Sequence, residues 1–215
     1  MGVLSIEIWS DIACPWCWVG KRHLEEAVAA AGVEVVRRWR AFELDPEAPR
    51  EAPESVDYAQ RLADKYGTSR EEAQKMIERM VERGRAAGVE IRFDRLRPCR
   101  TFDAHRLLVW AQEAENLQDA LGERLFEAYL GEGRAISDRE TLVALAVEVG
   151  LDGEEAVEIL DSDEYEETVR AEERQAALLG IRSVPTFVFD SRLAVTGAQP
   201  PRVLREAIDE AARSR

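Results

Sequence analysis

The sequence predicts an α/β fold in which a β-α-β unit at the front of the chain and a β-β-α unit at its end share one sheet. Two observations carry this prediction. The clearest runs of β-branched and aromatic residues lie near the two ends of the 215-residue chain, and the long stretch between them has mostly helical periodicity. We place the front unit at residues 1–43, an inserted all-helical domain at 44–180 and the closing unit at 181–215. Neither end has enough strands to bury a sheet alone, so we expect them to pair.

The front unit begins with an apolar run over residues 3–9 (VLSIEIW), which predicts a buried strand. A sharp turn follows, and helical periodicity then extends from about Cys14 to Ala31. Gly32 ends it, as is typical of a helix C-cap. Residues 33–41 (VEVVRRWRA) predict a second strand. Strand, helix and strand in this order favour two parallel strands joined by a right-handed crossover.

The inserted domain opens with a segment rich in Pro, Glu and Ala, which indicates a linker. Beyond it, helical periodicity dominates, apart from a strand-like patch at 89–93 (VEIRF). The predicted helices cover about 55–66, 69–87, 101–115, 117–130, 138–149, 154–160 and 163–179.

The closing unit contains a strand over 184–190 (VPTFVFD), a hairpin partner over 192–197 (RLAVTG) and a final helix over 200–213 with proline in its first turn. A β-α-β unit followed by a β-β-α unit is the topology of the thioredoxin fold. The sequence therefore predicts a thioredoxin fold with an inserted all-helical domain.

The turn after the first strand contains two cysteines in the sequence C-P-W-C. The amino end of a helix has partial positive charge and free N–H groups, so it stabilises a thiolate at Cys14, the expected nucleophile. Cys17 lies one turn further on and is expected to resolve the mixed disulfide. Pro15 suits a first helical turn because it has no N–H to satisfy. Trp16 offers apolar surface to a peptide substrate.

A zinc site is a weaker interpretation of these cysteines, because it usually needs two more ligands. Only Cys99, His23 and His105 remain, and they are scattered along the chain, so we expect no metal. His23 is expected at the surface. Cys99 is expected to be an unpaired thiol, with a sensory or resolving role as the alternative.

Three other polar residues are candidates for the site. Glu7 lies inside the apolar run of the first strand, where a buried carboxylate near Cys17 would relay a proton; a surface position is the alternative. Asp11 either braces the turn before Cys14 or is solvated. His105 lies on an apolar helical face, and is either a structural residue or part of the substrate-binding end of the insertion.

Several segments make the sequence resemble a known family. IEIWSDIACPWCWVGKRHLEEAV, TFDAHRLLVWA, and IRSVPTFVFD with VTGAQP resemble the FrnE-type branch of the DsbA-like thiol–disulfide oxidoreductases, in order over nearly the whole chain. The resemblance implies that Cys14 and Cys17 are the redox pair. It also implies that Pro185 has a cis bond facing them, and that the backbone from Val184 to Thr186 binds a substrate strand.

The sequence departs from this family at two places. Arg100-Thr101 stands where an Asn-Thr pair is usual, and the second cysteine pair of some relatives is missing. An external reductant or oxidant is therefore expected. The resemblance further implies a cytoplasmic setting and action in disulfide formation or isomerisation.

Charge and hydropathy restrict the partners. A net charge of -14 disfavours nucleic acid, and no apolar run of about 18 residues predicts a membrane span. The first residues lack the basic and small-residue pattern of a secretory signal. The expected partners are thiol- or disulfide-containing proteins or small thiols. No bound cofactor is expected beyond the redox-active disulfide, with glutathione as a candidate co-substrate, and the protein is expected to be a monomer or a homodimer.

Three functions stay open at the level of sequence. The first is a dithiol oxidoreductase or isomerase, whose Pro-Trp dipeptide lacks a histidine and so favours a moderately reducing pair. The second is a glutathione-dependent isomerase or transferase of the kappa-class or chromene-carboxylate isomerase type. Those enzymes generally have serine at the position of the redox pair. The third is a binding or chaperone module that uses the apolar surface around Trp16 and Trp18.

Overall fold

The computed structural model describes residues 3–114 and 117–214, and it has the thioredoxin fold with helices inserted in it. Within these residues a mixed four-stranded sheet has the order β2-β1-β3-β4. The first strand, β1 (Leu4–Ser10), is parallel to β2 (Val35–Ala41) and antiparallel to β3 (Thr186–Phe189). In turn, β3 is antiparallel to β4 (Leu193–Thr196). The two ends of the chain therefore build one sheet, as the sequence predicts.

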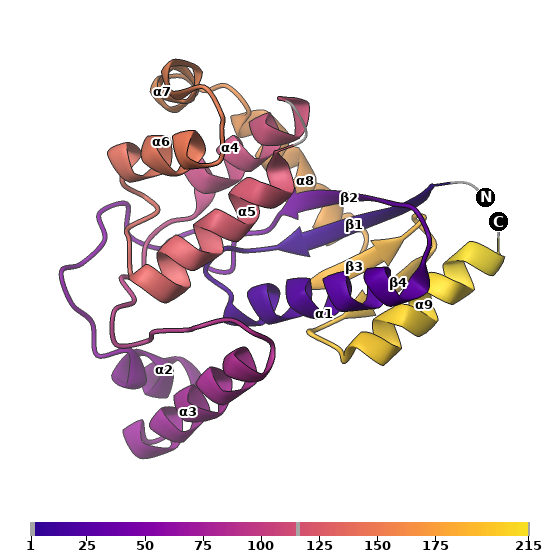
Figure 1. The fold of residues 1–215 in the computed structure, drawn as a ribbon. Helices are drawn as coiled ribbons and strands as arrows, with labels where there is room; N and C mark the ends of the chain where they lie inside the picture. The colour runs from indigo at the N-terminus through magenta and orange to yellow at the C-terminus, as the bar shows by residue number, and fades with distance from the viewer. Residues whose placement is uncertain (1–2, 115–116, 215) are drawn as a thin grey trace.

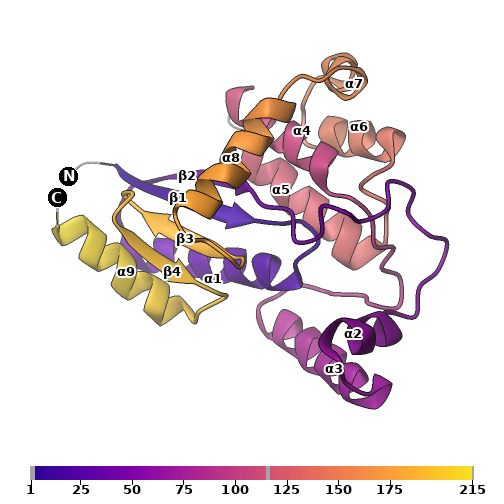
Figure 2. The same cartoon turned by 180° about the vertical axis from the view of Figure 1, so that it is seen from behind.

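The two faces of this sheet are covered by different helices. The helices α1 (Pro15–Ala31) and α9 (Pro201–Arg213) lie side by side on one face, whereas α8 (Glu166–Leu178) crosses the other (Figures 1 and 2). Because side chains alternate along a strand, Ile6 and Ile8 point to the α1 side, and Glu7 and Trp9 point to the α8 side.

The helices between β2 and β3 fall into two groups (Figure 1). One pair, α2 and α3, packs below the amino end of α1, and the others pack above it. Their bounds are α2 Tyr58–Tyr66, α3 Arg70–Ala86, α4 Phe102–Glu113, α5 Gln118–Phe126, the π-helix η1 Glu127–Glu132, α6 Arg139–Glu148, α7 Gly153–Asp161 and α8 Glu166–Leu178.

Along the carboxyl-terminal half of β2, side chains hydrogen-bond to the backbone groups at the outer edge of the sheet. The Trp39 N–H donates to Gln118 Oε1 at 2.8 Å, and Gln118 Nε2 donates back to the Trp39 carbonyl at 3.2 Å. Two residues on, the Ala41 N–H donates to Glu172 Oε2 at 2.8 Å. A strand edge with unsatisfied backbone groups invites pairing with another chain. Here α5 and α8 satisfy those groups and are themselves tied to the sheet.

The strand-like patch at 89–93 does not form a strand. Val89, Ile91 and Phe93 are buried in alternation, which produced the strand-like pattern. However, the segment is irregular backbone and has no ladder partner among the described strands; its Arg92 N–H donates to the Leu130 carbonyl at 2.7 Å. The alternation therefore records burial between α3 and η1 rather than sheet pairing.

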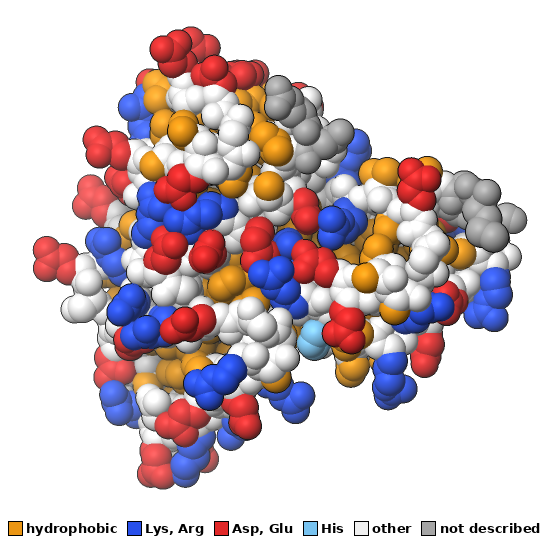
Figure 3. Space-filling model, in the orientation of Figure 1, with side chains coloured by type: hydrophobic (Ala, Val, Ile, Leu, Met, Phe, Trp, Pro, Cys, Tyr) orange, Lys and Arg blue, Asp and Glu red, His pale blue; other side chains and the backbone are white. Residues whose placement is uncertain are grey.

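The surface carries charges of both signs. Red and blue side chains are interspersed on the face shown in Figure 3, with orange apolar groups between them. Over residues 3–114 and 117–214, no helix is both long and apolar enough to cross a membrane.

One close approach fixes the spacing between α1 and β3. A Cβ added at Gly20 would lie 2.8 Å from Pro185 Cγ and 3.2 Å from Phe187 Cζ. We expect Gly20→Ala to lower the free energy of unfolding by about 1–3 kcal/mol, the usual cost of overpacking. Urea denaturation measures this change.

The matched control is Gly122→Ala on α5. There the nearest atom to an added Cβ is 3.7 Å away, which is ordinary contact. Because alanine is favoured over glycine within a helix by about 1 kcal/mol, this variant is expected to be as stable as the original chain or more stable. Equal effects of the two substitutions would contradict the proposed close approach.

Candidate active site

Cys14 stands at the amino end of α1. It is the N-cap residue, has extended backbone (φ -98°, ψ 108°) and is followed by Pro15 at the first helical position. The Cys14 N–H donates to the Asp11 carbonyl at 3.0 Å, which closes the turn from β1. The sulfur therefore lies where helical N–H groups and the helix dipole favour negative charge.

Cys17 lies one turn further into α1 and is 1% exposed. Burial raises the pKa of its thiol well above the usual value, and the neighbouring Cys14 raises it further, while Ser10 and Asp11 act in the opposite direction. Both cysteines are free thiols. Cys17 is consequently held protonated at neutral pH, as expected of a residue that reacts second.

The second half of the site comes from the far end of the chain. The Val184–Pro185 peptide bond is cis, as the family resemblance implied. The Cys14 thiol donates to the Val184 carbonyl, with Sγ and O 3.8 Å apart. Thr186 begins β3, and its Oγ1 donates to the Ser183 carbonyl at 2.8 Å. The pairing of β1 with β3 thus brings the two cysteines and the cis proline together.

Asp11 braces the turn before Cys14, which is one of the two alternatives that the sequence left open. Its side chain is buried: Oδ2 accepts the Leu44 N–H at 2.7 Å and Oδ1 accepts the Ala13 N–H at 3.2 Å. The carboxylate therefore links the cysteine turn to the segment that follows β2.

His105 packs against the Asp11 carboxylate. It is 3% exposed on α4, and its Nε2 is 3.5 Å from Asp11 Oδ1. Burial lowers the pKa of His105, but Asp11 and then Glu43 raise it by more, so the net shift is upward. His105 is absent from the lining of the large cavity described below. The structure therefore supports a structural position and gives no support to the predicted contact with substrate.

Glu7 is not placed near Cys17. It lies on the α8 side of the sheet, where its Oε1 accepts from Arg40 Nε at 2.9 Å. Arg40 also donates to Glu172 Oε1 at 2.7 Å. Since α1 covers the opposite face, the predicted proton relay from Glu7 has no geometric support. The sequence showed that Glu7 lies in a buried strand but not which face it occupies.

A large cavity opens beside Cys14, between the cysteine turn and the α2–α3 pair. Its volume is about 1240 Å³, and we call it the Cys14 cavity. Pro15 and Trp16 lie on its near wall, and Trp16 is 45% exposed. Tyr58 and Tyr129 line it deeper, and burial raises the pKa of Tyr58 to about 12, so its hydroxyl stays protonated.

Sequence reasoning missed the far wall of this cavity. The side chains from α2 and α3 show no catalytic motif, and their meeting with Cys14 depends on tertiary packing. Cys99 also lines the cavity; it is buried, and burial raises the pKa of its thiol. His23 is half-buried, with Nδ1 2.9 Å from the Gln199 carbonyl. Within the described ranges no three His, Cys, Asp or Glu residues gather as a metal site would need.

Comparisons with known proteins agree with this fold. The model of the DSBA-like thioredoxin domain matches residues 5–209. The chain belongs to this family. A probable DsbA oxidoreductase from Streptomyces coelicolor is 41% identical, with a TM-score of 0.89, over 99% of this chain and 91% of that one.

Two further proteins are similar to this chain. The uncharacterised protein YwbO of Bacillus subtilis (strain 168) is 32% identical to this DSBA-like chain over 210 residues, 96% of each. A putative protein disulfide isomerase from Nitrosomonas europaea has a TM-score of 0.76 at 17% identity, over 99% of each chain, and shares the fold.

The buried Asp11–His105 pair gives a pH-dependent stability. The pKa of His105 is higher in the folded chain than in the unfolded chain, where it is about 6.5. The stabilisation that His105 gives to the fold is therefore complete below about pH 6.5 and is lost as the pH rises through the folded pKa. We therefore expect the stability advantage of the original chain over His105→Gln to shrink on going from about pH 5.5 to 8.5. Urea denaturation across this range checks it. A constant difference would contradict the assignment.

Proposed function

We propose that the protein is a thiol–disulfide oxidoreductase that works through Cys14 and Cys17. The observation that carries the proposal is the Cys14 sulfur at the amino end of α1, 3.8 Å from the carbonyl beside the cis proline. This arrangement holds a nucleophile at one edge of the Cys14 cavity, with a second thiol behind it and the backbone of the cis proline beside it. Membership of the DSBA-like family supports the same chemistry.

Substrate reduction then proceeds in two exchanges. The Cys14 thiolate attacks one sulfur of a substrate disulfide; a Cys14–substrate disulfide forms, and the other substrate sulfur leaves as a thiolate that takes up a proton. Cys17 next loses its proton and attacks the Cys14 sulfur. The Cys14–Cys17 bond forms, and the second substrate thiol leaves. The protein loses two electrons and the substrate disulfide gains them; the same steps in reverse oxidise a dithiol.

Burial of Cys17 sets the order of these events. A protonated thiol does not attack, so Cys17 waits until Cys14 is already in a mixed disulfide. The backbone of Val184 is proposed to pair with the substrate segment next to its cysteine. With Cys99 as the third cysteine, the chain has no second pair to recharge the first, and we infer an external thiol or disulfide partner in the cytoplasm.

Reduction of insulin in the presence of dithiothreitol tests the proposal. Cys14→Ser is expected to lose all activity above background, because no attacking sulfur remains. When reduced Cys17→Ser is mixed with insulin after dithiothreitol has been removed, it is expected to accumulate a covalent substrate adduct, detected by mass spectrometry and released by added reductant, because the mixed disulfide cannot be resolved. Circular dichroism checks that both variants are folded. Full turnover by folded Cys14→Ser would overturn the proposed mechanism.

The reduction potential of the Cys14–Cys17 couple is expected between about -270 and -200 mV, nearer thioredoxin than DsbA. Pro15 and Trp16 supply no histidine to stabilise a Cys14 thiolate from within the turn, so the reduced form lacks the stabilisation that makes a strong oxidant. Equilibration with glutathione redox buffers measures the potential. A value near -120 mV would contradict this expectation.

A further inference from the structure

The Cys14 cavity has an apolar interior. Aromatic and aliphatic side chains from α2, α3 and the segment after α3 line it, among them Tyr58, Leu62, Met76, Ile77, Met80 and Phe93. Its volume of about 1240 Å³ exceeds the roughly 300–1000 Å³ that is usual for small-molecule sites. The space therefore suits a segment of peptide with apolar side chains better than a single small thiol.

The cavity wall on α2 and α3 also carries three cations that lack acidic partners. Lys65, Arg79 and Arg83 all line the cavity and are exposed. Across residues 3–114 and 117–214, none of the three lies within ion-pair distance of a carboxylate. Arg79 and Arg83 are four residues apart on α3, so they project from the same side of the helix.

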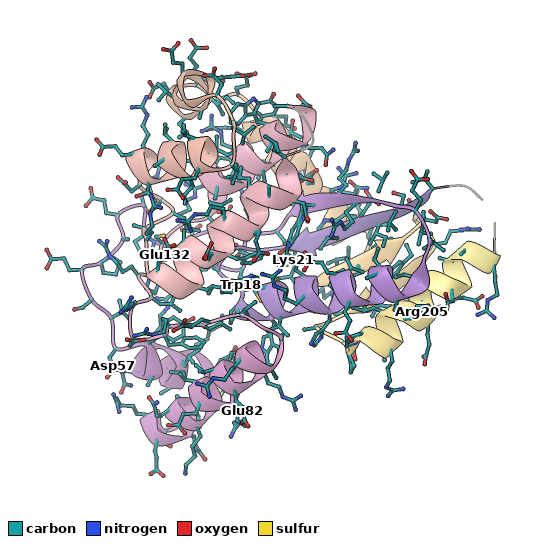
Figure 4. The ribbon with its side chains drawn as sticks, viewed as in Figure 1. Trp18, Lys21, Asp57, Glu82, Glu132 and Arg205 are labelled. Atoms are coloured by element: carbon teal, nitrogen blue, oxygen red, sulfur yellow. The ribbon has the colours of Figure 1, made fainter. Side chains whose placement is uncertain are left out.

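Two of the acids that line the cavity differ from these cations, because each already has an ion-pair partner. Asp45 pairs with Arg61 at 3.0 Å, and Asp57 pairs with Arg70 at 2.9 Å. Asp64 Oδ1 accepts from Gln60 Nε2 at 2.8 Å. Figure 4 shows Asp57 at the start of α2. Asp64 has only this neutral partner, Gln60, and Asp11, which also lines the cavity, is buried beside His105. Among the described residues that line the cavity, three exposed cations and one exposed carboxylate therefore lack an ion-pair partner, on a chain whose net charge is -14.

We propose that the Cys14 cavity binds acidic peptide segments, in which carboxylates flank apolar residues close to the substrate cysteine. The apolar interior would take the hydrophobic side chains, and Lys65, Arg79 and Arg83 would pair with the carboxylates. This inference rests on the proposed function for the role of Cys14. The rest of the acidic surface repels such a segment, so local attraction at the cavity also orients it toward the sulfur.

A binding experiment separates this inference from catalysis. The host is the Cys14→Ser/Cys17→Ser chain, and the probes are fluorescent, cysteine-free peptides with one apolar core and either glutamate, glutamine or lysine on both sides of it. Fluorescence anisotropy measures the dissociation constants. The glutamate peptide is expected to bind most tightly, about tenfold better than the lysine peptide, and rising salt is expected to reduce the difference.

Charge removal on α3 locates the site. Arg79→Gln/Arg83→Gln in this host is expected to weaken binding of the glutamate peptide about three- to tenfold, with little change for the glutamine peptide. The matched control is Arg85→Gln/Arg92→Gln, which removes two cations that do not line the Cys14 cavity. Arg85 lines a different hollow together with Glu82, labelled on α3 in Figure 4. The control is expected to change binding less than twofold.

The outcomes are distinct from those of the insulin assay. No binding, no preference for the glutamate peptide, or equal losses in the two double variants would overturn the inference even if insulin is reduced through Cys14. Glutamate-selective binding that depends on Arg79 and Arg83 would support it even if the insulin assay fails, in which case the proposed chemistry alone is wrong.

Discussion

The contact between the Cys14 sulfur and the Val184 carbonyl is the constraint on which the site depends. The two residues are 170 positions apart in the chain, and only the antiparallel pairing of β1 with β3 brings them within 3.8 Å. The same pairing stacks Pro185 against Gly20, which has no side chain to hold α1 away. The position of the nucleophile is therefore a property of the whole sheet rather than of the C-P-W-C turn alone.

Local patterns were sufficient to predict much of the fold. The strands and helices of the two terminal units leave clear periodicity and capping residues, so β1, α1 and α9 lie within a residue or two of their predicted ranges. The cysteine pair was visible because its chemistry depends on local spacing. The segment at 89–93 shows the limit of this reasoning, since alternating burial arises wherever an extended chain passes over a core.

The alternatives left open and the residues missed at the site have one physical origin. Periodicity shows that a residue is buried but not what covers it, so a relay near Cys17 and a surface position both stayed open for Glu7, which in the structure faces Arg40 and α8. For His105 the sequence likewise left a structural position and a substrate contact open, and the structure packs it against Asp11. The far wall of the Cys14 cavity was invisible for the same reason, because the α2–α3 pair meets the active-site turn only through tertiary packing. The other group of inserted helices contacts α1 directly, since Trp18 and Lys21 (Figure 4) both bind Glu123 of α5, at 2.9 and 2.8 Å.

The closed edge of β2 has a consequence for self-association. Gln118 and Glu172 occupy the hydrogen-bonding groups of Trp39 and Ala41 that an incoming strand would need. A second copy of the chain cannot extend the sheet across that stretch without first displacing two buried side chains. Continuous growth of a fibre through this edge is thereby opposed by the same two residues that hold the inserted helices in place.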